Sequence, residues 1–544
     1  MPDFLDILHD VPRARLESTQ ANQTLTFAFA TGCGNNAFER LFAHARPTTS
    51  SFSRECFATD LFLDSFVELC LSTRLTTDGR KFYHDSLLSL LTSPPRNRAD
   101  TQLRQGVFRE LGEQPELLAA CEQTWRRIDT LRLALESSCI GKRASAISRR
   151  IEILSQLGEV VRELSGAFNG SRSALARIGQ YFATLTRQDS FERLNQLIDC
   201  DGHLATLDLR VTVGRNGQIR NLLVLARAEN AVNSHYLGPI ARFWDRIVIF
   251  FLGYSIRDQE LMGRVVESVF EGVQPALLAL LELQLQLEFY LSLVGLTKHC
   301  AARGLDTCLP ELSTSEPMQA SHFEALFNPF LLREEQPPVP CDLELPESGM
   351  TFLTGPNSGG KTRLLQALGL SQLLAQCGAP IPARRARLSW REGMFVSLVH
   401  EMSADQREGR LGTELLRIRR LFDRIGIGEL VLLDELCSGT NPSEGEEIVE
   451  LVILLLSRLQ PQAVVTTHFL QFAARLAQSP PVPGLGFLQV ELDEHQLPRY
   501  RFVPGVASTS LAAKTAERLG VTREALEALI ERKSTYLGRT PEKS

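Results

Sequence analysis

Short, largely apolar runs recur through the last third of the chain. Met350–Leu353, Leu430–Leu433 and Ala463–Thr467 are too short for ordinary helices and contain no charged residue. Such runs are typical of strands that are buried on both faces of a parallel sheet. Between them, Leu364–Leu374 and Ile448–Leu456 have apolar residues at helical spacing, which predicts two packed helices. The pattern predicts an α/β domain.

The middle of the chain has the periodicity of long helices. Apolar residues at helical spacing occupy 117–137, 147–164, 168–197 and 228–300. A continuous arm of about 30 residues would span roughly 45 Å, because a helix rises about 1.5 Å per residue. A compact helical bundle would have the same periodicity, so both arrangements stay open.

A strand pair interrupts these helical stretches. Leu207–Val213 alternates between apolar and polar residues, Asn216-Gly217 is a strong hairpin-turn signal, and Ile219–Leu225 can return as the second strand. We therefore expect a small β insertion within a mainly helical domain. Nearer the N-terminus we expect a strand at 22–30 and a helix at 61–71, with no candidate chemistry.

Composition narrows the class of protein. The 544 residues are enough for two to four domains, and the net charge of −6 means that nucleic-acid binding would need a local basic surface. The eleven cysteines are scattered without a C-x-x-C pair, which predicts free thiols in a reducing compartment. The acidic start is unlike a secretory signal, and 277–296 carries polar residues unsuited to a bilayer span. We expect a cytoplasmic protein without a membrane partner.

A glycine-rich loop follows the first of the buried runs. Gly355, Gly360, Lys361 and Thr362 have the spacing G-x-x-x-x-G-K-[ST], between a predicted strand and a predicted helix. Backbone N–H groups of such a loop bind phosphate oxygens, Lys361 would pair with the β- and γ-phosphates, and the Thr362 hydroxyl would bind Mg²⁺. The predicted cofactors are ATP and Mg²⁺. The candidate loop residues are Gly355, Pro356, Asn357, Ser358, Gly359, Gly360, Lys361 and Thr362.

Two adjacent carboxylates end the second run. Asp434 and Glu435 follow Leu430–Leu433, at the strand end where open α/β sheets bind ligands. We assign Asp434 to the metal shell, directly or through water, and Glu435 to the attacking water as general base. An exposed acidic turn is the alternative.

The next segments supply a helix start and a histidine. Ser438, Gly439, Thr440 and Asn441 precede a helix that begins at Pro442, with Asn441 as a good N-cap. His468 follows the third apolar run, and we predict that it senses the γ-phosphate. A structural histidine and a plain helix start are the corresponding alternatives.

These motifs together resemble the ATPase domain of the MutS proteins, the mismatch-repair members of the ABC-type ATPase superfamily. The matching segments are Thr354–Thr362, Ala375–Ala383, Leu432–Leu436, Gly439-Thr440 and Thr466–Phe469. The resemblance implies that two ATPase domains pair in a homodimer, so that the helix beginning near Asn441 faces the partner's nucleotide. One departure is the segment Gly409–Thr413, where the family usually has Ser-Thr after the glycine.

The resemblance extends more weakly to the rest of the chain. It implies that the β insertion is a reduced DNA clamp, in which Arg210, Arg215 and Arg220 contact phosphates; a solvated charged face is the alternative. Residues 505–520 resemble the family's dimerising helix-turn-helix. The family's Phe-x-Glu wedge is not found near the start, so we expect no mismatch-binding domain and weak mismatch discrimination. We also expect no small nuclease domain of the kind one MutS paralogue carries.

The expected fold is multidomain. It comprises an N-terminal segment (1–90), core and lever helices (91–325) with a clamp insertion near 204–228, an α/β ABC-type ATPase domain (326–504) and a helical dimerisation tail (505–544). The expected function is ATP hydrolysis coupled to clamping of mismatched or branched DNA in mismatch repair or recombination control, with repair proteins as possible partners. The alternatives are a MutS-like ATPase that acts on branched DNA or ribosomes, and a nucleotide-gated scaffold.

Overall fold

The computed structural model divides the chain into two compact units. The first, the helical unit, comprises Met1–Thr49, Val67–Leu296 and Cys377–Ala379, and the second, the sheet unit, comprises Ser50–Phe66, Thr297–Gln376 and Pro380–Ser544. The structure describes residues 4–34, 36–71, 82–137, 143–203, 206–213, 219–228, 256–313, 320–398, 410–437, 441–508, 521 and 523–537. For 143–146, 199–203, 206–213, 219–228, 256–262, 410 and 531–537 this description covers the backbone alone.

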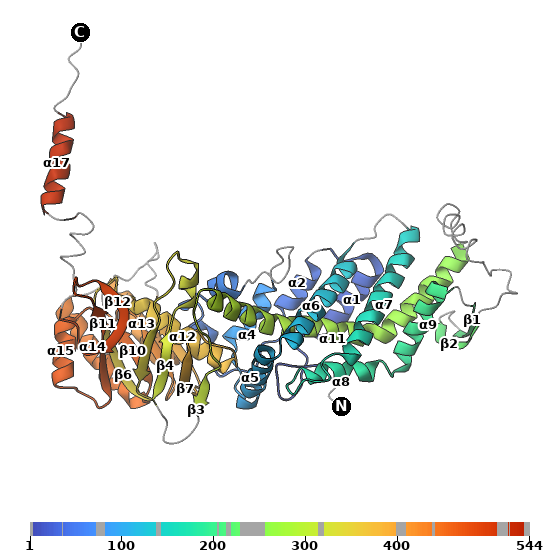
Figure 1. Cartoon of the computed structure of the whole chain (residues 1–544), viewed down its shortest axis with the longest axis horizontal. Helices are drawn as coiled ribbons and strands as arrows, with labels where there is room; N and C mark the ends of the chain where they lie inside the picture. The colour runs from blue at the N-terminus through green and yellow to red at the C-terminus, as the bar shows by residue number, and fades with distance from the viewer. Residues whose placement is uncertain are drawn as a thin grey trace, which may run out of the picture. The chain divides into compact units, whose positions relative to one another are not determined.

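The helical unit consists mainly of helices, with a pair of short strands (Figure 1). Its elements are α1 (Ser18–Thr31), α2 (Ala37–Ala43), the π-helical η2 (Val67–Leu71), α4 (His84–Thr92), α5 (Arg98–Glu113), α6 (Pro115–Glu136), α7 (Arg143–Gly166), α8 (Ala176–Leu185), α9 (Asp189–His203), β1 (Thr206–Val213), β2 (Ile219–Ala228) and most of α11 (Ile256–Ala302). The expected strand pair is confirmed, because β1 and β2 pair antiparallel. The predicted turn at Asn216-Gly217 lies outside the described residues.

The expected strand at 22–30 is wrong, because these residues belong to α1. Threonine and phenylalanine favour strands, which suggested that prediction. However, Ala21, Leu25, Ala28 and Phe29 are buried and fall on one face at helical spacing. The Glu17 side chain also caps the helix by accepting a hydrogen bond from the Gln20 backbone N–H. The helix expected at 61–71 is confirmed over 63–71, where the α-helical turn α3 (Leu63–Phe66) continues directly into the π-helical η2.

The long helix α11 carries polar side chains into the core of the helical unit. Glu282 accepts hydrogen bonds from the backbone N–H groups of Arg15 and Leu16, and Glu288 accepts one from Tyr83. Among the described residues, Gly263–Ala302 is the segment that is long and apolar enough to cross a membrane by composition, yet 89% of its most apolar window is buried within the protein. These contacts are those of a core helix.

The sheet unit contains a six-stranded sheet in the order β12-β11-β6-β10-β9-β8. Its strands are β6 (Gly349–Thr354), β8 (Met394–Ser397), β9 (Leu430–Leu433), β10 (Gln462–Thr466), β11 (Leu485–Leu492) and β12 (Pro498–Pro504). All neighbours pair parallel except β11 with β12. The predicted buried strands are thus confirmed, and parallel pairing brings the carboxyl ends of β6, β10 and β9 to one edge.

The sheet unit also contains further helices and a second sheet. The helices are η1 (Arg54–Cys56), α3, η3 (Pro329–Arg333), α12 (Lys361–Gln376), α13 (Arg410–Arg424), α14 (Pro442–Leu456), η4 (Ser457–Leu459), α15 (Leu470–Gln478) and α17 (Arg523–Leu537). A second sheet has the order β3-β7-β4-β5, formed by Glu311–Ser313, Arg385–Ser389, Ser321–Leu326 and Cys341–Leu345. Much of the expected helix-turn-helix, residues 509–520, lies outside the described residues.

The units divide the chain differently from the four expected segments. Residues 50–66 belong to the sheet unit although they precede the long helices, and 297–325 belong to it as well. Packing explains the first difference: Leu61 and Leu432 meet at Gly369, where a β-carbon would lie 2.6 Å from the Leu61 side chain. Only a glycine leaves room for this contact.

Candidate nucleotide-binding site

The glycine loop joins β6 to α12 at the carboxyl edge of the six-stranded sheet. Gly355 has φ 138° and Gly360 has φ 86°, conformations that residues with a β-carbon rarely adopt. A β-carbon at Gly355 would also lie 2.7 Å from the Val490 side chain on β11. Both the backbone conformation and this contact therefore require glycine, and the loop turns directly into the N-terminus of α12.

Lys361 is held beneath its own loop. Its ammonium donates hydrogen bonds to the carbonyl oxygens of Gly355 at 2.9 Å and Pro356 at 3.0 Å, and the residue is only 3% exposed. Burial lowers the pKa of the Lys361 ammonium, and the carboxylates of Glu435 and Asp434 partly oppose that shift. The positive charge of Lys361 is thus held near the loop by two carbonyl oxygens, which phosphate oxygens could replace.

Asp434 links three elements at the sheet edge. The Thr362 hydroxyl donates to its Oδ2 at 2.6 Å, and the Thr466 hydroxyl at the end of β10 donates to its Oδ1 at 2.6 Å. Thr466 also accepts a hydrogen bond of 2.8 Å from the Glu435 backbone N–H. Thr466 thereby ties both carboxylate residues to the neighbouring strand, a role that sequence reasoning missed because it depends on strand order.

The segment after β9 has an unusual backbone. Glu435 has φ 47° and Cys437 has φ 61°, and neither is glycine. Left-handed conformations of ordinary residues cost on the order of 1 kcal/mol each and tend to occur at functional sites. The turn leaves the Glu435 side chain partly exposed beside the phosphate loop, whereas Asp434 is buried.

The helix start after this turn is described from Asn441 onward. The Asn441 side chain accepts a hydrogen bond of 3.2 Å from the Ser443 backbone N–H, and Pro442 occupies the first turn of α14, so the predicted N-cap is confirmed. Ser438, Gly439 and Thr440 lie outside the described residues, and their assignment to nucleotide binding stays a prediction.

His468 lies just beyond β10. The preceding Thr467 donates its backbone N–H to the Leu353 carbonyl at 3.2 Å, which places this segment beside the end of β6. The His468 ring is partly exposed and lies 4.1 Å from the Phe469 ring, centroid to centroid. The structure thus brings His468 to the same sheet edge as the other candidate residues.

Two further side chains reach the loop from β11 and β12. Val490 packs against Gly355 and Gly359, and a Tyr500 ring carbon lies 3.3 Å from the position of a β-carbon on Gly360. Tyr500 is 47% exposed and has φ 57°, so its ring offers an open aromatic face beside the phosphate loop. No sequence signal marks these residues, because they lie more than 120 positions after the loop.

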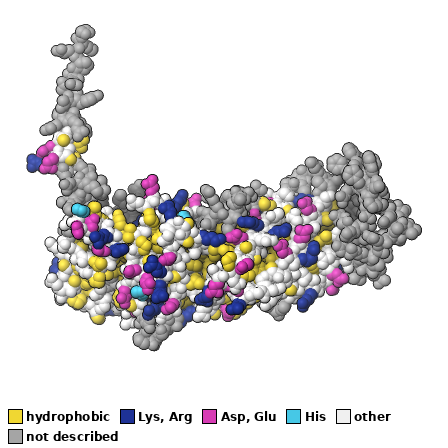
Figure 2. All heavy atoms as spheres, in the orientation of Figure 1, with side chains coloured by type: hydrophobic (Ala, Val, Ile, Leu, Met, Phe, Trp, Pro, Cys, Tyr) yellow, Lys and Arg dark blue, Asp and Glu magenta, His cyan; other side chains and the backbone are white. Residues whose placement is uncertain are grey.

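The clamp arginines are described less fully. Arg210 lies in β1 and Arg220 in β2, where the structure describes the backbone alone, and Arg215 lies outside the described residues. Their contact with DNA stays a prediction. Figure 2 shows Lys and Arg interspersed with Asp and Glu over the visible face of the described residues.

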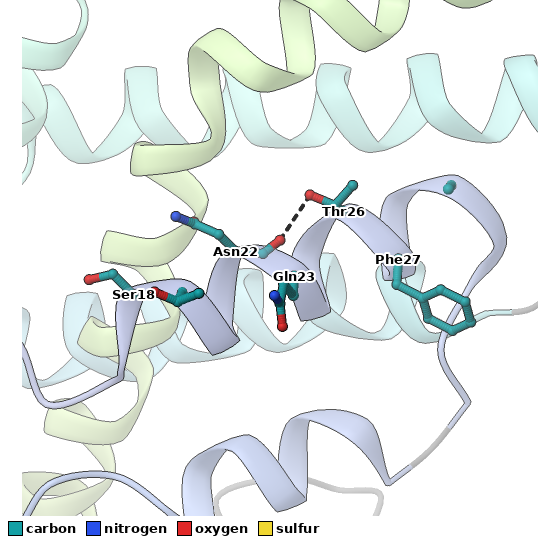
Figure 3. Close-up of a pocket in the computed structure, with 7 residues that line it drawn as sticks. Ser18, Asn22, Gln23, Thr26 and Phe27 are labelled. Atoms are coloured by element: carbon teal, nitrogen blue, oxygen red, sulfur yellow. Dashed lines mark hydrogen bonds between the residues drawn. The ribbon is translucent and has the colours of Figure 1, made fainter.

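A separate open hollow lies on α1 in the helical unit. Figure 3 shows its side chains projecting from this single helix, with the Thr26 hydroxyl bonded to the Asn22 carbonyl at 2.9 Å. The lining residues are Ser18, Thr19, Asn22, Gln23, Thr26, Phe27 and Ala30. None of them is titratable, so the hollow offers no catalytic group.

The residues at the sheet edge fit ATP and Mg²⁺. The Thr362 hydroxyl and the Asp434 carboxylate are hard oxygen donors, which suit Mg²⁺. No group of three or more His, Cys, Asp or Glu side chains among the described residues could hold a metal ion. A donor set of one carboxylate and one hydroxyl is nevertheless sufficient, because Mg²⁺ commonly takes its other ligands from phosphate and water. Strand, glycine loop, helix and neighbouring carboxylate define a phosphate-loop domain.

Comparison with known proteins identifies the kind of phosphate-loop domain. Residues 351–535 match the family model of MutS domain V. Endonuclease MutS2 of Thermomicrobium roseum is 31% identical over 281 residues, which are 50% of this chain and 34% of that protein. Endonuclease MutS2 of Fusobacterium nucleatum is 29% identical over 43% of this chain and 29% of its own length. Endonuclease MutS2 of Thermus thermophilus is 34% identical over 177 residues, which are 32% of this chain and 23% of that protein.

The resemblance to the MutS ATPase domain that the motifs predicted is thus confirmed for residues 351–535, which match MutS domain V. The chain spans about a third or less of the length of these curated relatives.

Proposed function

We propose that this protein is a Mg²⁺-dependent ATPase of the MutS type, which couples ATP binding and hydrolysis to DNA binding. The observation that carries the proposal is the meeting of Lys361, Thr362, Asp434 and Glu435 at one sheet edge, linked by the hydrogen bonds of Thr362 and Thr466. The match of residues 351–535 to MutS domain V supports the same proposal.

Each residue has a distinct part in the proposed reaction. The loop N–H groups and Lys361 bind the phosphates, and Lys361 exchanges its two carbonyl partners for phosphate oxygens. Thr362 and Asp434 would hold Mg²⁺, which would neutralise developing phosphate charge. Glu435 orients the attacking water and accepts its proton, while His468 contacts the γ-phosphate. Tyr500 offers its ring to the adenine base.

For the wider assembly, the proposal rests on the resemblance to MutS proteins. We propose that two copies pair as a homodimer, with Ser438–Asn441 and the start of α14 facing the nucleotide of the partner. The β1–β2 hairpin would contact DNA phosphates through Arg210, Arg215 and Arg220. Mismatched or branched DNA is the proposed substrate class, with DNA repair proteins as partners.

The chemistry is tested with Glu435→Gln. Because an amide cannot take a proton from water, we expect turnover to fall about 100-fold or more while ATP binding is retained. Glu494→Gln, at an exposed residue of the same unit, is the matched control. Wild-type protein without Mg²⁺-stimulated hydrolysis would refute the ATPase proposal, and unchanged turnover in Glu435→Gln would remove that residue as the base.

The proposed binding of DNA, and its coupling to ATP, needs a separate measurement. Homoduplex, mismatched and four-way-junction DNA are titrated with the protein, with and without ATP, across a salt series. We expect ATP to change DNA affinity and affinity to fall as salt rises, because phosphate contacts release counterions. An absence of DNA binding, with ATP hydrolysis intact, would favour ribosomes as the substrate.

A further inference from the structure

Arg417 of α13 bonds to the backbone that carries Asp434. Its guanidinium donates through Nη2 to the Ser397 carbonyl at 2.5 Å and to the Asp434 carbonyl at 3.3 Å, and through Nε to the Ser397 hydroxyl. The Ser397 carbonyl also accepts the Asp434 backbone N–H at 2.9 Å. One side chain thus bridges the ends of β8 and β9, immediately behind the carboxylate proposed to bind Mg²⁺.

The guanidinium itself is anchored within its helix. Glu414, three residues earlier on α13, places its carboxylate 3.7 Å from Nη1, and the two side chains are only 14% and 8% exposed. The pair is therefore nearly neutral as a unit, so its effect on a nearby cation would come mainly from geometry. A lysine could not reproduce it, because a single ammonium lacks the planar fork that reaches Ser397 and Asp434 together.

The end of β8 is also held from a second direction. The Asp60 carboxylate accepts the backbone N–H of Leu398, the residue after β8, at 2.7 Å. Asp60 belongs to the 50–66 segment of the same sheet unit. Since that bond holds β8 whatever occupies position 417, a change at Arg417 is expected to loosen Asp434 without detaching the strand.

We propose that Arg417 is a positioning residue for the metal site, which keeps the Asp434 carboxylate in register with the Thr362 hydroxyl and thereby sets the affinity for Mg²⁺. This inference rests on the proposed function. The carboxylate is fixed by Thr362 and Thr466, and its backbone by Ser397 and Arg417. Groups behind metal ligands commonly change metal affinity about 10- to 100-fold when they are removed.

The test measures metal binding apart from turnover. Binding of a fluorescent, non-hydrolysable ATP analogue is titrated with Mg²⁺ and, separately, measured in EDTA. For Arg417→Met and Arg417→Lys we expect the Mg²⁺ concentration at half-saturation to rise about tenfold. Nucleotide affinity in EDTA should stay within about twofold, because the phosphate loop is untouched. Arg419→Met is the matched control, since the Arg419 side chain on the same helix is 78% exposed.

Three results would overturn the inference. The first is an unchanged Mg²⁺ requirement in folded Arg417→Met. The second is full restoration by Arg417→Lys, which would show that charge alone matters. If Arg417→Met does not fold, Ser397→Ala serves instead, because it removes one acceptor of the guanidinium and should also raise the Mg²⁺ requirement. The third contradicting result is an unchanged Mg²⁺ requirement in Ser397→Ala.

Failure of the proposed function gives a different result. A wild-type protein that binds the analogue equally with and without Mg²⁺ would refute the metal site as such. A wild-type protein with a Mg²⁺-dependent affinity, together with unaffected Arg417 variants, would refute only the positioning role.

Discussion

The hydroxyl of Thr362 donates a hydrogen bond of 2.6 Å to the carboxylate of Asp434, a residue 72 positions further along the chain. Thr362 lies in the first turn of α12 and Asp434 follows β9, so the bond joins the phosphate loop to the second acidic motif. Both oxygens are hard donors that a Mg²⁺ ion can share. Bound Mg²⁺ would take these two oxygens as ligands in place of the hydrogen bond.

Removal of the Thr362 hydroxyl should therefore weaken metal binding selectively. Thr362→Val keeps the side-chain shape but loses the donor oxygen, and we expect Mg²⁺-stimulated ATP hydrolysis to fall about 100-fold. Thr362→Ser retains the hydroxyl and is the control that should stay near wild type. Hydrolysis rates at a series of Mg²⁺ concentrations measure the effect, and equal rates in the valine and serine variants would contradict it.

The hairpin arginines should affect DNA binding and leave the ATP site alone. For the triple variant Arg210→Ala, Arg215→Ala, Arg220→Ala we expect weaker DNA binding and a shallower salt dependence. Each lost phosphate contact would reduce the log–log slope by about one unit. ATP hydrolysis without DNA should be unchanged, because the catalytic residues lie on other elements.

A matched triple variant distinguishes a clamp from a general charge effect. Arg384, Arg385 and Arg387 are exposed arginines at β7, and their replacement by alanine removes the same net charge. We expect this control to bind DNA almost as wild type. If both triple variants lose the same affinity and slope, or neither does, the clamp assignment is wrong.

The buried Glu288 should make the stability of the helical unit depend on pH. Its carboxyl group accepts hydrogen bonds from the Tyr83 backbone N–H at 2.9 Å and the Trp125 indole at 3.0 Å. Burial raises the pKa of Glu288 from 4.5 to about 8, a shift that these donors and Arg132 only partly oppose. Between these pH values the folded state keeps a proton that the unfolded state releases. Its stabilising contribution is therefore complete below about pH 4.5 and is lost as pH rises towards 8.

Glu288→Gln tests this linkage, because an amide does not ionise. We expect its melting temperature to fall less between pH 5 and pH 8 than that of the wild type. Some pH dependence should remain, since burial also raises the pKa of Glu282, to about 7. Glu113→Gln, an exposed change at the end of α5, is the control. If the melting temperatures of Glu288→Gln and wild type fall by the same amount between pH 5 and pH 8, the prediction is wrong.

Local pattern was sufficient for the elements of the candidate site. The apolar runs predicted β6, β9 and β10 because a strand buried on both faces must be apolar throughout. The motif spacing indicated that Gly355 and Gly360 form a tight phosphate loop, and both have a positive φ in the structure. Asn441 and Pro442 predicted the start of α14, since helix caps depend on a few adjacent residues.

Local pattern failed where packing decided the conformation. Residues 22–30 have strand-forming side chains, yet they form part of α1 because Ala21, Leu25 and Ala28 bury one helical face. The segment 50–66 has no motif that assigns it to the sheet unit. Its place there depends on Leu61 filling the space left by Gly369, a contact between residues some 300 positions apart.

The sequence by itself determined which residues can do chemistry: a lysine and a threonine after a glycine loop, and two carboxylates after an apolar run. Only the tertiary structure decided what holds them. Thr466 reaches Asp434 because β10 lies beside β9, and Arg417 of α13 joins Asp434 to Ser397 because β8 lies on the other side of β9. Tyr500 lies close to Gly360 although β12 is the edge strand of the sheet. The physical reason is that periodicity and capping act over a few residues, whereas strand order is set by how apolar faces pack across the whole unit.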